Sequence, residues 1–385
     1  MRVALVHDYL VEYGGAERVL EALHEIWPQS PVFVAYFNPE GLGPHKKRFK
    51  NWDIRQSWGK NLPFMPHLLS FYRIFAPLFF EGFDFSDFDV VISSTNIYFA
   101  KGIVTKPETL HICYCHTPPR FLYGYPYATR FRNYPLVKQV SDVLNHFLRI
   151  YDYLSAQRVD YFVANSKNTA ARIKKFYRRE ATVIYPPVEI KKFPSSKLQV
   201  PSSNYFLFVS RLDYFKRPDL AVEACNRLKV PLKVVGKGPE EERIRKMAGP
   251  TVEILGEVSD EELARLYQGC RALIYPAQEE DFGIVPLEAM AVGRPVIALR
   301  SGGVLESVIE GKTGVFFDEP TVESLIGAIK HYNNTYYCNE KRRGEMEKNC
   351  LKQARRFSKE RFKKEIKKFV ACKLRLKDDE STESG

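Results

Sequence analysis

The sequence lacks the marks of several large protein classes. Its seven cysteines include no CxxC pair, which argues against a zinc site and, in a chain of 385 residues, against a disulfide scaffold. We therefore expect reduced thiols in a cytosol. The apolar stretch at residues 62–80 is broken by three prolines, so we expect it to lie on a surface or in a core rather than to span a membrane. The apolar run within residues 1–10 is too short for a signal peptide and is typical of a first strand.

Acidic residues are fewer than basic ones, 46 against 58, and the formal net charge is +12. The excess indicates either a soluble surface or an anionic partner, which would be a phosphate ligand, an anionic lipid surface or a nucleic acid. Nucleic acid is the least favoured of these, because the sequence has neither zinc-finger spacing nor the aromatic signature of an RNA-binding sheet. Aromatic residues form 14% of the chain, and together with basic residues they suit a membrane surface.

Short apolar runs alternate with amphipathic stretches along the chain, which is typical of βαβ units and a parallel sheet. A segment rich in Ser and Pro, residues 194–203, separates two such series and places a boundary near 186–204. We predict an α/β fold of two Rossmann-like, doubly wound domains, residues 1–190 and 200–350. Strands are expected at 2–8, 89–94, 110–116, 161–166, 205–212, 232–238, 252–258, 271–277, 295–301 and 314–319.

The C-terminal region is predicted to have two parts. Residues 355–376 form a basic helix that is expected to complete the first domain, and residues 377–385 are polar and expected to be disordered. Helices are also expected at 16–26 and 218–228, and at 259–270, where Ser259 and Glu262 form a capping box.

The loop after the first predicted strand carries polar residues and glycines. Ligands of doubly wound sheets bind at the carboxyl ends of strands, and His7 and Asp8 stand at such an end. Gly14 and Gly15 then precede a helix whose free N–H groups can receive an anion. A tight turn that needs glycine explains the pair equally simply.

The stretch 210–220 places two cations at another strand end. Arg211 leaves the strand, and Lys216 precedes a helix that is expected to start near Pro218. Both charges add to the positive end of the helix dipole, which is unfavourable without a ligand and favourable beside a diphosphate. The alternative is a pair of solvated surface charges.

The stretch 279–299 adds carboxylates at a third strand end. Glu288 is expected in the first turn of a helix, where an acid is favourable without any ligand. Glu280 lies in the preceding loop, where it can accept hydrogen bonds from sugar hydroxyls. The backbone N–H groups of Phe282, Gly283 and Ile284 point toward a phosphate at the helix start. Cations for a diphosphate and carboxylates for hydroxyls together predict a nucleotide sugar as the ligand.

The segments SRLDYFKRPDLAVEA, VVGKGPEEERI and EEDFGIVPLEAMAVGRPVIA, in this order, resemble the retaining family 4 glycosyltransferases. The resemblance covers residues 1–370 and implies the GT-B fold, in which two Rossmann-like domains face each other across a cleft and the C-terminal one holds most of the donor. It implies that Glu280 contacts the donor sugar and Glu288 the ribose. Arg211 and Lys216 would neutralise the leaving diphosphate. Gly236 and the loop around Val258 would lie beside the donor nucleotide.

The N-terminal half narrows this resemblance. HICYCHTPPRFLYGY, YFVANSKNTAARIKKFY and IYPPVE resemble mannosyltransferases that build lipopolysaccharide and related surface glycans from GDP-mannose. In that branch His116 would face the donor sugar and Gly15 would lie near the phosphates, although His116 also fits a structural histidine. Asp8 and Gly14 are assigned to the acceptor side.

No metal or other cofactor is expected, because fixed cations would stabilise the leaving diphosphate. The competing signal is the triplet 87-DFD-89, which resembles a metal-binding DxD. It precedes a strand in the acceptor half and is therefore disfavoured as a site.

The acceptor half also holds the aromatic and basic segments 62–83 and 118–151. They suit an anionic bilayer, so we expect a peripheral enzyme on the inner face of the cytoplasmic membrane, acting on a lipid-linked glycan. A buried interdomain or oligomer contact is the alternative. The rival functions are a UDP-sugar-dependent glycosyltransferase, a nucleotide-sugar epimerase and a non-catalytic nucleotide-sugar-binding subunit.

Overall fold

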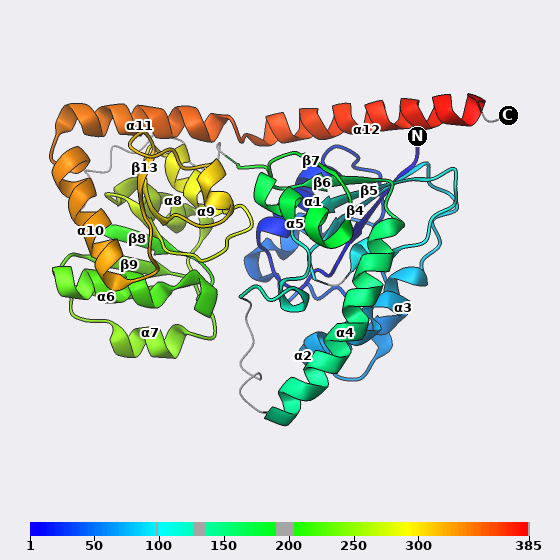
Figure 1. The fold of residues 1–385 in the computed structure, drawn as a ribbon, viewed down its shortest axis with the longest axis horizontal. Helices are drawn as coiled ribbons and strands as arrows, with labels where there is room; N and C mark the ends of the chain where they lie inside the picture. The colour runs from blue at the N-terminus through cyan, green and yellow to red at the C-terminus, as the bar shows by residue number, and fades with distance from the viewer. Residues whose placement is uncertain (98, 127–134, 190–203, 384–385) are drawn as a thin grey trace. The chain divides into compact units, whose positions relative to one another are not determined.

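The computed structural model describes residues 1–97, 99–126, 135–189 and 204–383 (Figure 1). The chain divides into two compact units. Unit 1 comprises Met1–Tyr125, Thr129–Pro187 and Glu360–Gly385, and unit 2 comprises Pro126–Ala128 and Val188–Lys359. The predicted linker at 194–203 lies outside the described residues.

Unit 1 is built on a parallel sheet of seven strands in the order β3-β2-β1-β4-β5-β6-β7. The chain adds strands outward in one direction and then starts again beside β1, so the switch point lies between β1 and β4. The strands are β1 (Val3–His7), β2 (Val32–Val34), β3 (Ile54–Gln56), β4 (Val90–Thr95), β5 (Leu110–Cys115), β6 (Tyr161–Ala164) and β7 (Ala181–Val183).

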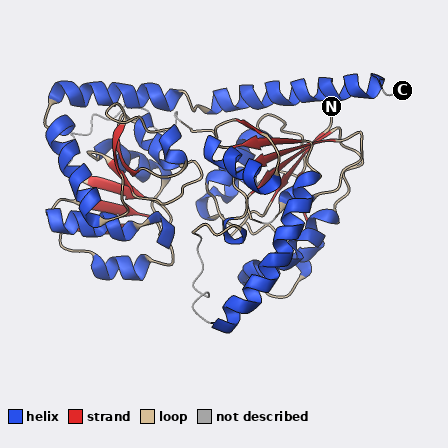
Figure 2. Ribbon diagram, viewed as in Figure 1, coloured by secondary structure: helices blue, strands red, loops and turns tan. Residues whose placement is uncertain are grey.

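Helices cover both faces of this sheet (Figure 2). One core joins alternate residues of β1, β4 and β5 to α1 and to Phe362, Ile366 and Val370 of α12. A second core joins the other residues of β5 and β6 to α5 and the end of α4. The helices are α1 (Gly15–His24), α2 (Met65–Tyr72), α3 (Ala76–Glu81), α4 (Pro135–Gln157), α5 (Lys167–Tyr177) and α12 (Lys359–Glu383).

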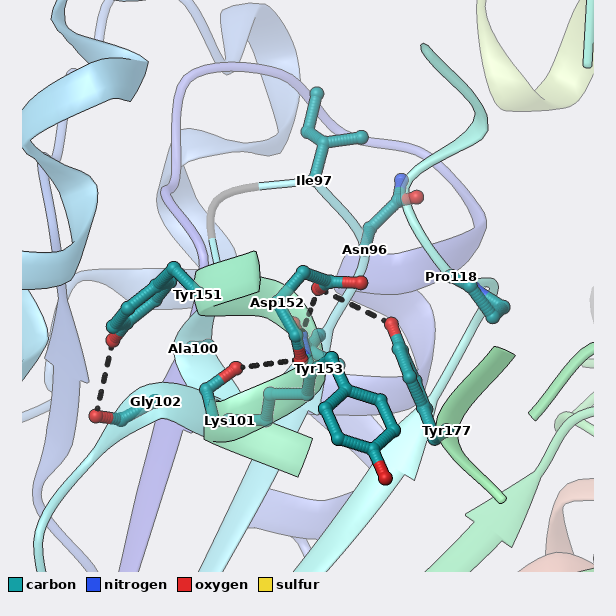
Figure 3. A network of polar contacts seen from close by, with 12 residues as sticks. Asn96, Ile97, Ala100, Lys101, Gly102, Pro118, Tyr151, Asp152, Tyr153 and Tyr177 are labelled. Atoms are coloured by element: carbon teal, nitrogen blue, oxygen red, sulfur yellow. Dashed lines mark hydrogen bonds and ion pairs between the residues drawn. The ribbon is translucent and has the colours of Figure 1, made fainter. Parts of the chain in front are cut away.

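A buried ion pair anchors α4 to unit 1. Lys101 pairs with Asp152, and both side chains are almost fully buried. Asp152 also accepts hydrogen bonds from the hydroxyls of Tyr177 (3.2 Å) and Tyr123 (2.7 Å), and Figure 3 shows the cluster around Asp152. Every partner therefore belongs to the packing of unit 1, and the cluster has a structural role.

Unit 2 repeats the same plan with six parallel strands in the order β10-β9-β8-β11-β12-β13. Its switch point lies between β8 and β11. The strands are β8 (Phe206–Val209), β9 (Leu232–Val235), β10 (Val252–Gly256), β11 (Leu273–Tyr275), β12 (Val296–Leu299) and β13 (Gly314–Phe317).

Two helices of unit 2, α6 and α8, begin where their sequences predict. Pro218 opens α6, as suits a residue without an N–H. The Ser259 hydroxyl accepts the N–H of Glu262 at the start of α8. The helices are α6 (Pro218–Leu228), α7 (Glu241–Met247), α8 (Asp260–Gly269), α9 (Ile284–Ala291), α10 (Val322–Tyr332) and α11 (Glu340–Arg355).

The prediction of a disordered tail at 377–385 is wrong for residues 377–383, because α12 continues to Glu383. An existing helix is extended at little cost, since each added residue gains one backbone hydrogen bond. Lys377 also donates a hydrogen bond to the carbonyl of Thr109 (2.8 Å). The strands β2, β3 and β7, of three residues each, were not predicted.

Candidate functional site

In unit 2, the loops after β8 and β11 meet at the switch point. Lys216 from the first loop forms an ion pair with Glu280 from the second. The backbone N–H of Gln278 donates to the carbonyl of Phe215 (2.9 Å), which joins the same two loops. The structure thus brings together a predicted cation and a predicted carboxylate that are 64 residues apart in sequence.

Glu280 is held at a defined position. Its Oε2 accepts a hydrogen bond from the hydroxyl of Tyr275 (2.9 Å), and only 9% of the residue is exposed. Tyr275 ends β11, so the strand itself fixes the carboxylate. The sequence pattern gave no signal for Tyr275, because a tyrosine in an apolar strand is also typical of a core.

Arg211 lies beside a carboxylate that the sequence reasoning missed. Its Nε donates to Oδ2 of Asp213 at 2.5 Å, and its side chain is 53% exposed while that of Asp213 is 2% exposed. The expectation that the two cations stand uncompensated in the empty protein is therefore wrong. Asp213 offsets Arg211, and Glu280 offsets Lys216.

A double glycine holds the loop that carries Glu280. The N–H of Gly303 donates to the carbonyl of Glu280 at 2.7 Å. A Cβ at Gly302, where φ is +72°, would lie 2.3 Å from the same carbonyl oxygen, so only glycine allows this approach. Glu279 has a φ of +52°, which marks a tightly constrained loop. The signal in the sequence was the pair of glycines directly after the strand predicted at 295–301.

The start of α9 differs in part from its prediction. Gly283 caps the helix with a φ of +84°, and Ile284 is its first residue. The Phe282 side chain is buried against Phe357, with ring centroids 5.6 Å apart, so Phe282 can offer a ligand only its backbone.

Glu288 lies beyond the first turn of α9, since it is the fifth residue of a helix that starts at Ile284. The prediction that Glu288 lies in the first turn was wrong, because the helix already begins at Ile284. Glu288 is buried, and its Oε2 accepts a hydrogen bond from the hydroxyl of Tyr267 (2.9 Å). This bond orients the carboxylate that the resemblance assigns to the ribose.

The ends of β9 and β10 complete this edge of the sheet. Gly236 has a φ of +128°, and a Cβ there would lie 1.9 Å from the carbonyl oxygen of Ser210. Its N–H donates to the carbonyl of Gly256 (2.7 Å). Val258 is half-buried and lies two residues beyond the end of β10. Parallel strands place all these residues at one edge, together with Arg211.

In unit 1, Asp8 follows β1 at the switch point and is buried. Its Oδ2 accepts the backbone N–H groups of Asn96 (2.7 Å) and Ile97 (2.6 Å), and its Oδ1 accepts that of Ala100 (2.9 Å). Thr95 adds a longer hydrogen bond (3.3 Å). This arrangement makes Asp8 the anchor of the chain after β4, which supports a structural role better than the predicted contact with an acceptor.

His116 follows β5 at the same edge and is 8% exposed. Its Nε2 lies 2.8 Å from Oγ of Ser94. Burial lowers the pKa of His116 to about 3, so the ring is neutral at neutral pH. A buried neutral imidazole has one donor and one acceptor nitrogen.

The glycine pair of unit 1 belongs to the start of α1. Gly14 is the N-cap and Gly15 the first helical residue, one position earlier than predicted. The N–H of Gly14 donates to Oε2 of Glu17 at 2.8 Å, which is the carboxylate half of a capping box. Gly14 has an extended backbone, so its conformation does not require glycine.

The predicted site residues therefore form two groups. Asp8, Gly14, Gly15 and His116 belong to unit 1, and the remaining ones belong to unit 2. The triplet at 87–89 lies at the opposite edge of the unit 1 sheet, since it precedes β4 and its Asp89 accepts the N–H of Arg2 (2.6 Å). Among the described residues, no cluster of three or more His, Cys, Asp or Glu is arranged to hold a metal ion.

Two family models match the chain. The model for "Glycosyltransferase Family 4" matches residues 13–192, and the model for "Glycosyl transferases group 1" matches residues 189–357. The mouse alpha-1,3/1,6-mannosyltransferase ALG2 is 28% identical over 80% of this chain and 81% of its own length. The O-antigen chain mannosyltransferase C of Escherichia coli is 29% identical over 49% of this chain and 56% of its own length.

Solved structures share the fold. Anabaena Alr3699/HepE in complex with UDP has a TM-score of 0.69 at 17% identity, covering 97% of this chain and 100% of its own. Sucrose-phosphate synthase from Thermosynechococcus elongatus has a TM-score of 0.74 at 16% identity, covering 98% and 100%. In the described part of the chain, no helix is both long and apolar enough to cross a membrane.

Proposed function

Since the chain is a GT-B glycosyltransferase of family 4 and a hexosyltransferase, we propose that it transfers mannose from GDP-mannose, with retention, to a lipid-linked glycan. The observation that carries the proposal is the Lys216–Glu280 pair at the switch point of unit 2. A nucleotide sugar offers a partner to each member of this pair, since its diphosphate attracts the lysine and its sugar hydroxyls donate to the carboxylate.

The proposed reaction chemistry follows from this binding of the diphosphate by Lys216 and of the sugar by Glu280. Transfer requires stabilisation of the charge that develops on the leaving diphosphate. Arg211 and Lys216 supply fixed positive charge, and the N–H groups at the start of α9 add to it. Glu280 orients the sugar, and Glu288 the ribose. His116 of unit 1 is proposed to bind a hydroxyl of the donor sugar. No step in this scheme requires a metal ion.

The choice of mannose is supported by the mannosyltransferase names of the mouse and E. coli relatives. The choice of GDP rests on the resemblance of the N-terminal half to mannosyltransferases that use GDP-mannose. A second candidate is a UDP-sugar donor, because the Anabaena neighbour of the same fold was solved with UDP-glucose. The nucleotide base would be recognised largely by the backbone around Val258, so the side chains in the sequence do little to distinguish a GDP-sugar from a UDP-sugar.

A thermal-shift panel tests the donor. GDP, GDP-mannose, UDP, UDP-glucose and ADP are each added with EDTA and again with magnesium. A ligand that binds only the native state raises the melting temperature. We expect a rise with GDP and GDP-mannose that EDTA leaves unchanged. A rise with uridine compounds alone would overturn the assignment of donor, and a rise that needs magnesium would overturn metal independence.

The membrane-bound acceptor is supported by apolar side chains that unit 1 leaves exposed. They lie along α4 and in the segment of α2 and α3, and their exposed fractions run from 38% to 74%. The members are Val140, Val143, Leu144, Phe147, Ile150 and Leu154, with Phe64, Leu68, Phe71, Phe75 and Leu78. Other residues of the same segments, such as Phe79, Phe80 and Leu148, are buried, so the segments serve both core and surface.

Liposome sedimentation tests this surface. We expect the protein to sediment with vesicles that contain anionic lipid, and Phe147→Asp to weaken sedimentation while GDP-mannose still raises the melting temperature. Ile309→Asp is the control, because Ile309 is an exposed apolar residue of unit 2. Sedimentation that is independent of both anionic lipid and Phe147 would remove the membrane from the proposal.

A further inference from the structure

We propose that Glu17, His7 and Ser94 form a positioning network that fixes the tautomer of His116, so that His116 presents Nδ1 as a hydrogen-bond acceptor to a hydroxyl of the donor sugar. The inference rests on the proposed function, because it takes His116 as a residue that contacts the donor. It assigns a role to three buried polar residues that no other part of the mechanism uses.

The network crosses three neighbouring strands at one edge of the sheet. His7 ends β1, Ser94 lies near the end of β4, and His116 follows β5. His7 and Ser94 are direct partners in the parallel register. All three belong to the alternation that faces α1, because Leu5, Ile92 and Tyr114, two residues before each of them, lie in the core shared with that helix.

The contacts are continuous from α1 to His116. Oε1 of Glu17 lies 3.4 Å from Nε2 of His7, and Nδ1 of His7 lies 3.1 Å from Oγ of Ser94. Oγ of Ser94 lies 2.8 Å from Nε2 of His116. Each of the four residues is at most 8% exposed, so protein groups rather than water must satisfy these polar atoms.

The proton positions follow from the carboxylate end. Glu17 can only accept, so His7 donates through Nε2–H, and in the network that we propose Nδ1 of His7 keeps its lone pair. Ser94 then donates its hydroxyl proton to that lone pair and accepts from Nε2–H of His116. His116 is therefore left with a lone pair on Nδ1. Since Nε2 is engaged by Ser94, Nδ1 is the ring atom that would accept a hydrogen bond from the sugar.

A second serine–histidine pair in the same strands shows what a purely structural pair looks like. Ser93 and His111 lie on the opposite face, with Oγ and Nε2 2.9 Å apart, and both are fully buried. That pair ends inside unit 1, whereas the network on the α1 side ends at the carboxyl edge of the sheet, where doubly wound folds bind ligands.

The substitution Glu17→Gln tests the proton assignment directly. The N–H of Gly14 needs an acceptor, so it holds the amide oxygen and turns the amide NH₂ toward His7. His7 must then accept at Nε2 and donate from Nδ1, Ser94 must donate to Nε2 of His116, and His116 must carry its proton on Nδ1. The helix cap is retained.

The readout is a long-range ¹H–¹⁵N spectrum of protein labelled in histidine, which distinguishes protonated from unprotonated ring nitrogens. His116→Gln assigns the signals. We expect His116 to be the Nε2–H tautomer in the wild type and the Nδ1–H tautomer in Glu17→Gln. The Nδ1–H tautomer in the wild type, or the same tautomer in both proteins, would overturn the network. This result does not depend on which reaction the protein catalyses.

Turnover of GDP-mannose provides the second readout. We expect Ser94→Ala to lower kcat about tenfold, which corresponds to ~1.4 kcal/mol of barrier. In the His116→Gln background the same change should have no further effect, because Ser94 acts through His116. Ser93→Ala is the matched control and should leave kcat unchanged.

The outcomes separate the two claims. Wild-type turnover in His116→Gln would remove His116 from the donor site and so contradict the proposed role of that residue, whatever its tautomer. Loss of turnover in His116→Gln, together with wild-type turnover in Ser94→Ala and Glu17→Gln, would keep that role and refute the network. An equal loss of turnover in Ser93→Ala and Ser94→Ala would show that Ser94 acts only through folding, and would refute its role in the network.

Discussion

The two switch points share one topology, but their carboxylates have different partners. In unit 1 the carboxylate after the strand, Asp8, accepts hydrogen bonds from three backbone N–H groups, and these bonds hold the fold. In unit 2 the strand-end carboxylate, Glu280, is paired with Lys216, which a charged ligand can compete for. The comparison teaches that position at a switch point does not decide function. The partners of the side chain decide it.

The polar groups that remain at the edges differ in the same way. At the carboxyl edge of its sheet, unit 1 has a neutral histidine, His116, that is linked to a hydroxyl and a second imidazole. This arrangement suits recognition of sugar hydroxyls. Unit 2 ends in two cations with carboxylate partners, which suits a molecule that is both anionic and rich in hydroxyls. Substitutions can test whether this division is real.

The largest expected effect is on the cations of unit 2. Lys216→Ala should lower kcat by about 10²–10³-fold, because a fixed charge at the leaving group is lost. Lys233→Ala is the matched control, since Lys233 pairs with Glu253 at 3.1 Å within the strands of the same unit. Steady-state kinetics with GDP-mannose give the comparison. Equal activity of the two variants would exclude Lys216 from the site.

Asp8→Asn should act on stability instead. An amide NH₂ would face backbone N–H groups that are buried, and each unsatisfied group costs roughly 1–3 kcal/mol. We expect the free energy of unfolding to fall by about 3 kcal/mol. Arg300→Ala should change it by less than about 1 kcal/mol, because both partners are exposed in its ion pairs with Glu310 and Asp318. Urea unfolding measures both, and a stable Asp8→Asn variant would return Asp8 to the candidate acceptor site.

The buried histidines of unit 1 predict a pH dependence of stability. Burial lowers the pKa of His111 to about 4 and that of His116 to about 3. Below the ordinary pKa of 6.5, the unfolded chain binds protons that the folded chain does not, so stability falls as the pH drops from 6.5 toward 4. The slope is about 1.4 kcal/mol per pH unit for each histidine.

Urea unfolding between pH 7 and pH 4 checks this slope. His111→Gln removes one titrating group and should therefore lower the slope of stability against pH by the contribution of one histidine. An unchanged slope would mean that His111 titrates alike in the folded and unfolded chains.

The smallest effect is expected at the amino edge of the unit 1 sheet. Asp87→Ala should leave turnover and its response to EDTA unchanged, because Asp87 is 85% exposed and its ion pair with Arg2 is 3.7 Å long. A loss of activity that magnesium restores would revive the triplet 87–89 as a metal site.

Sequence periodicity sufficed for most of the fold but not for side-chain partners. The capped helix after Ser259 and the helix from Pro218 were predicted, because their signals are local. Asp213 and Tyr275 were missed, since a short-range pattern does not show which residues the folded loops bring together. The same holds for Ser94, which reads as a strand residue until its neighbours in the sheet are known.

The measurement that tests the central claim most directly is calorimetric titration of GDP and of GDP-mannose into wild type and Glu280→Gln. If Lys216 binds the diphosphate and Glu280 binds the sugar, the substitution should weaken GDP-mannose by about tenfold or more, ~1.4 kcal/mol, and leave the affinity for GDP equal or higher. An equal loss of affinity for both ligands, or no loss for either, would contradict the assignment of the diphosphate to Lys216 and of the sugar to Glu280.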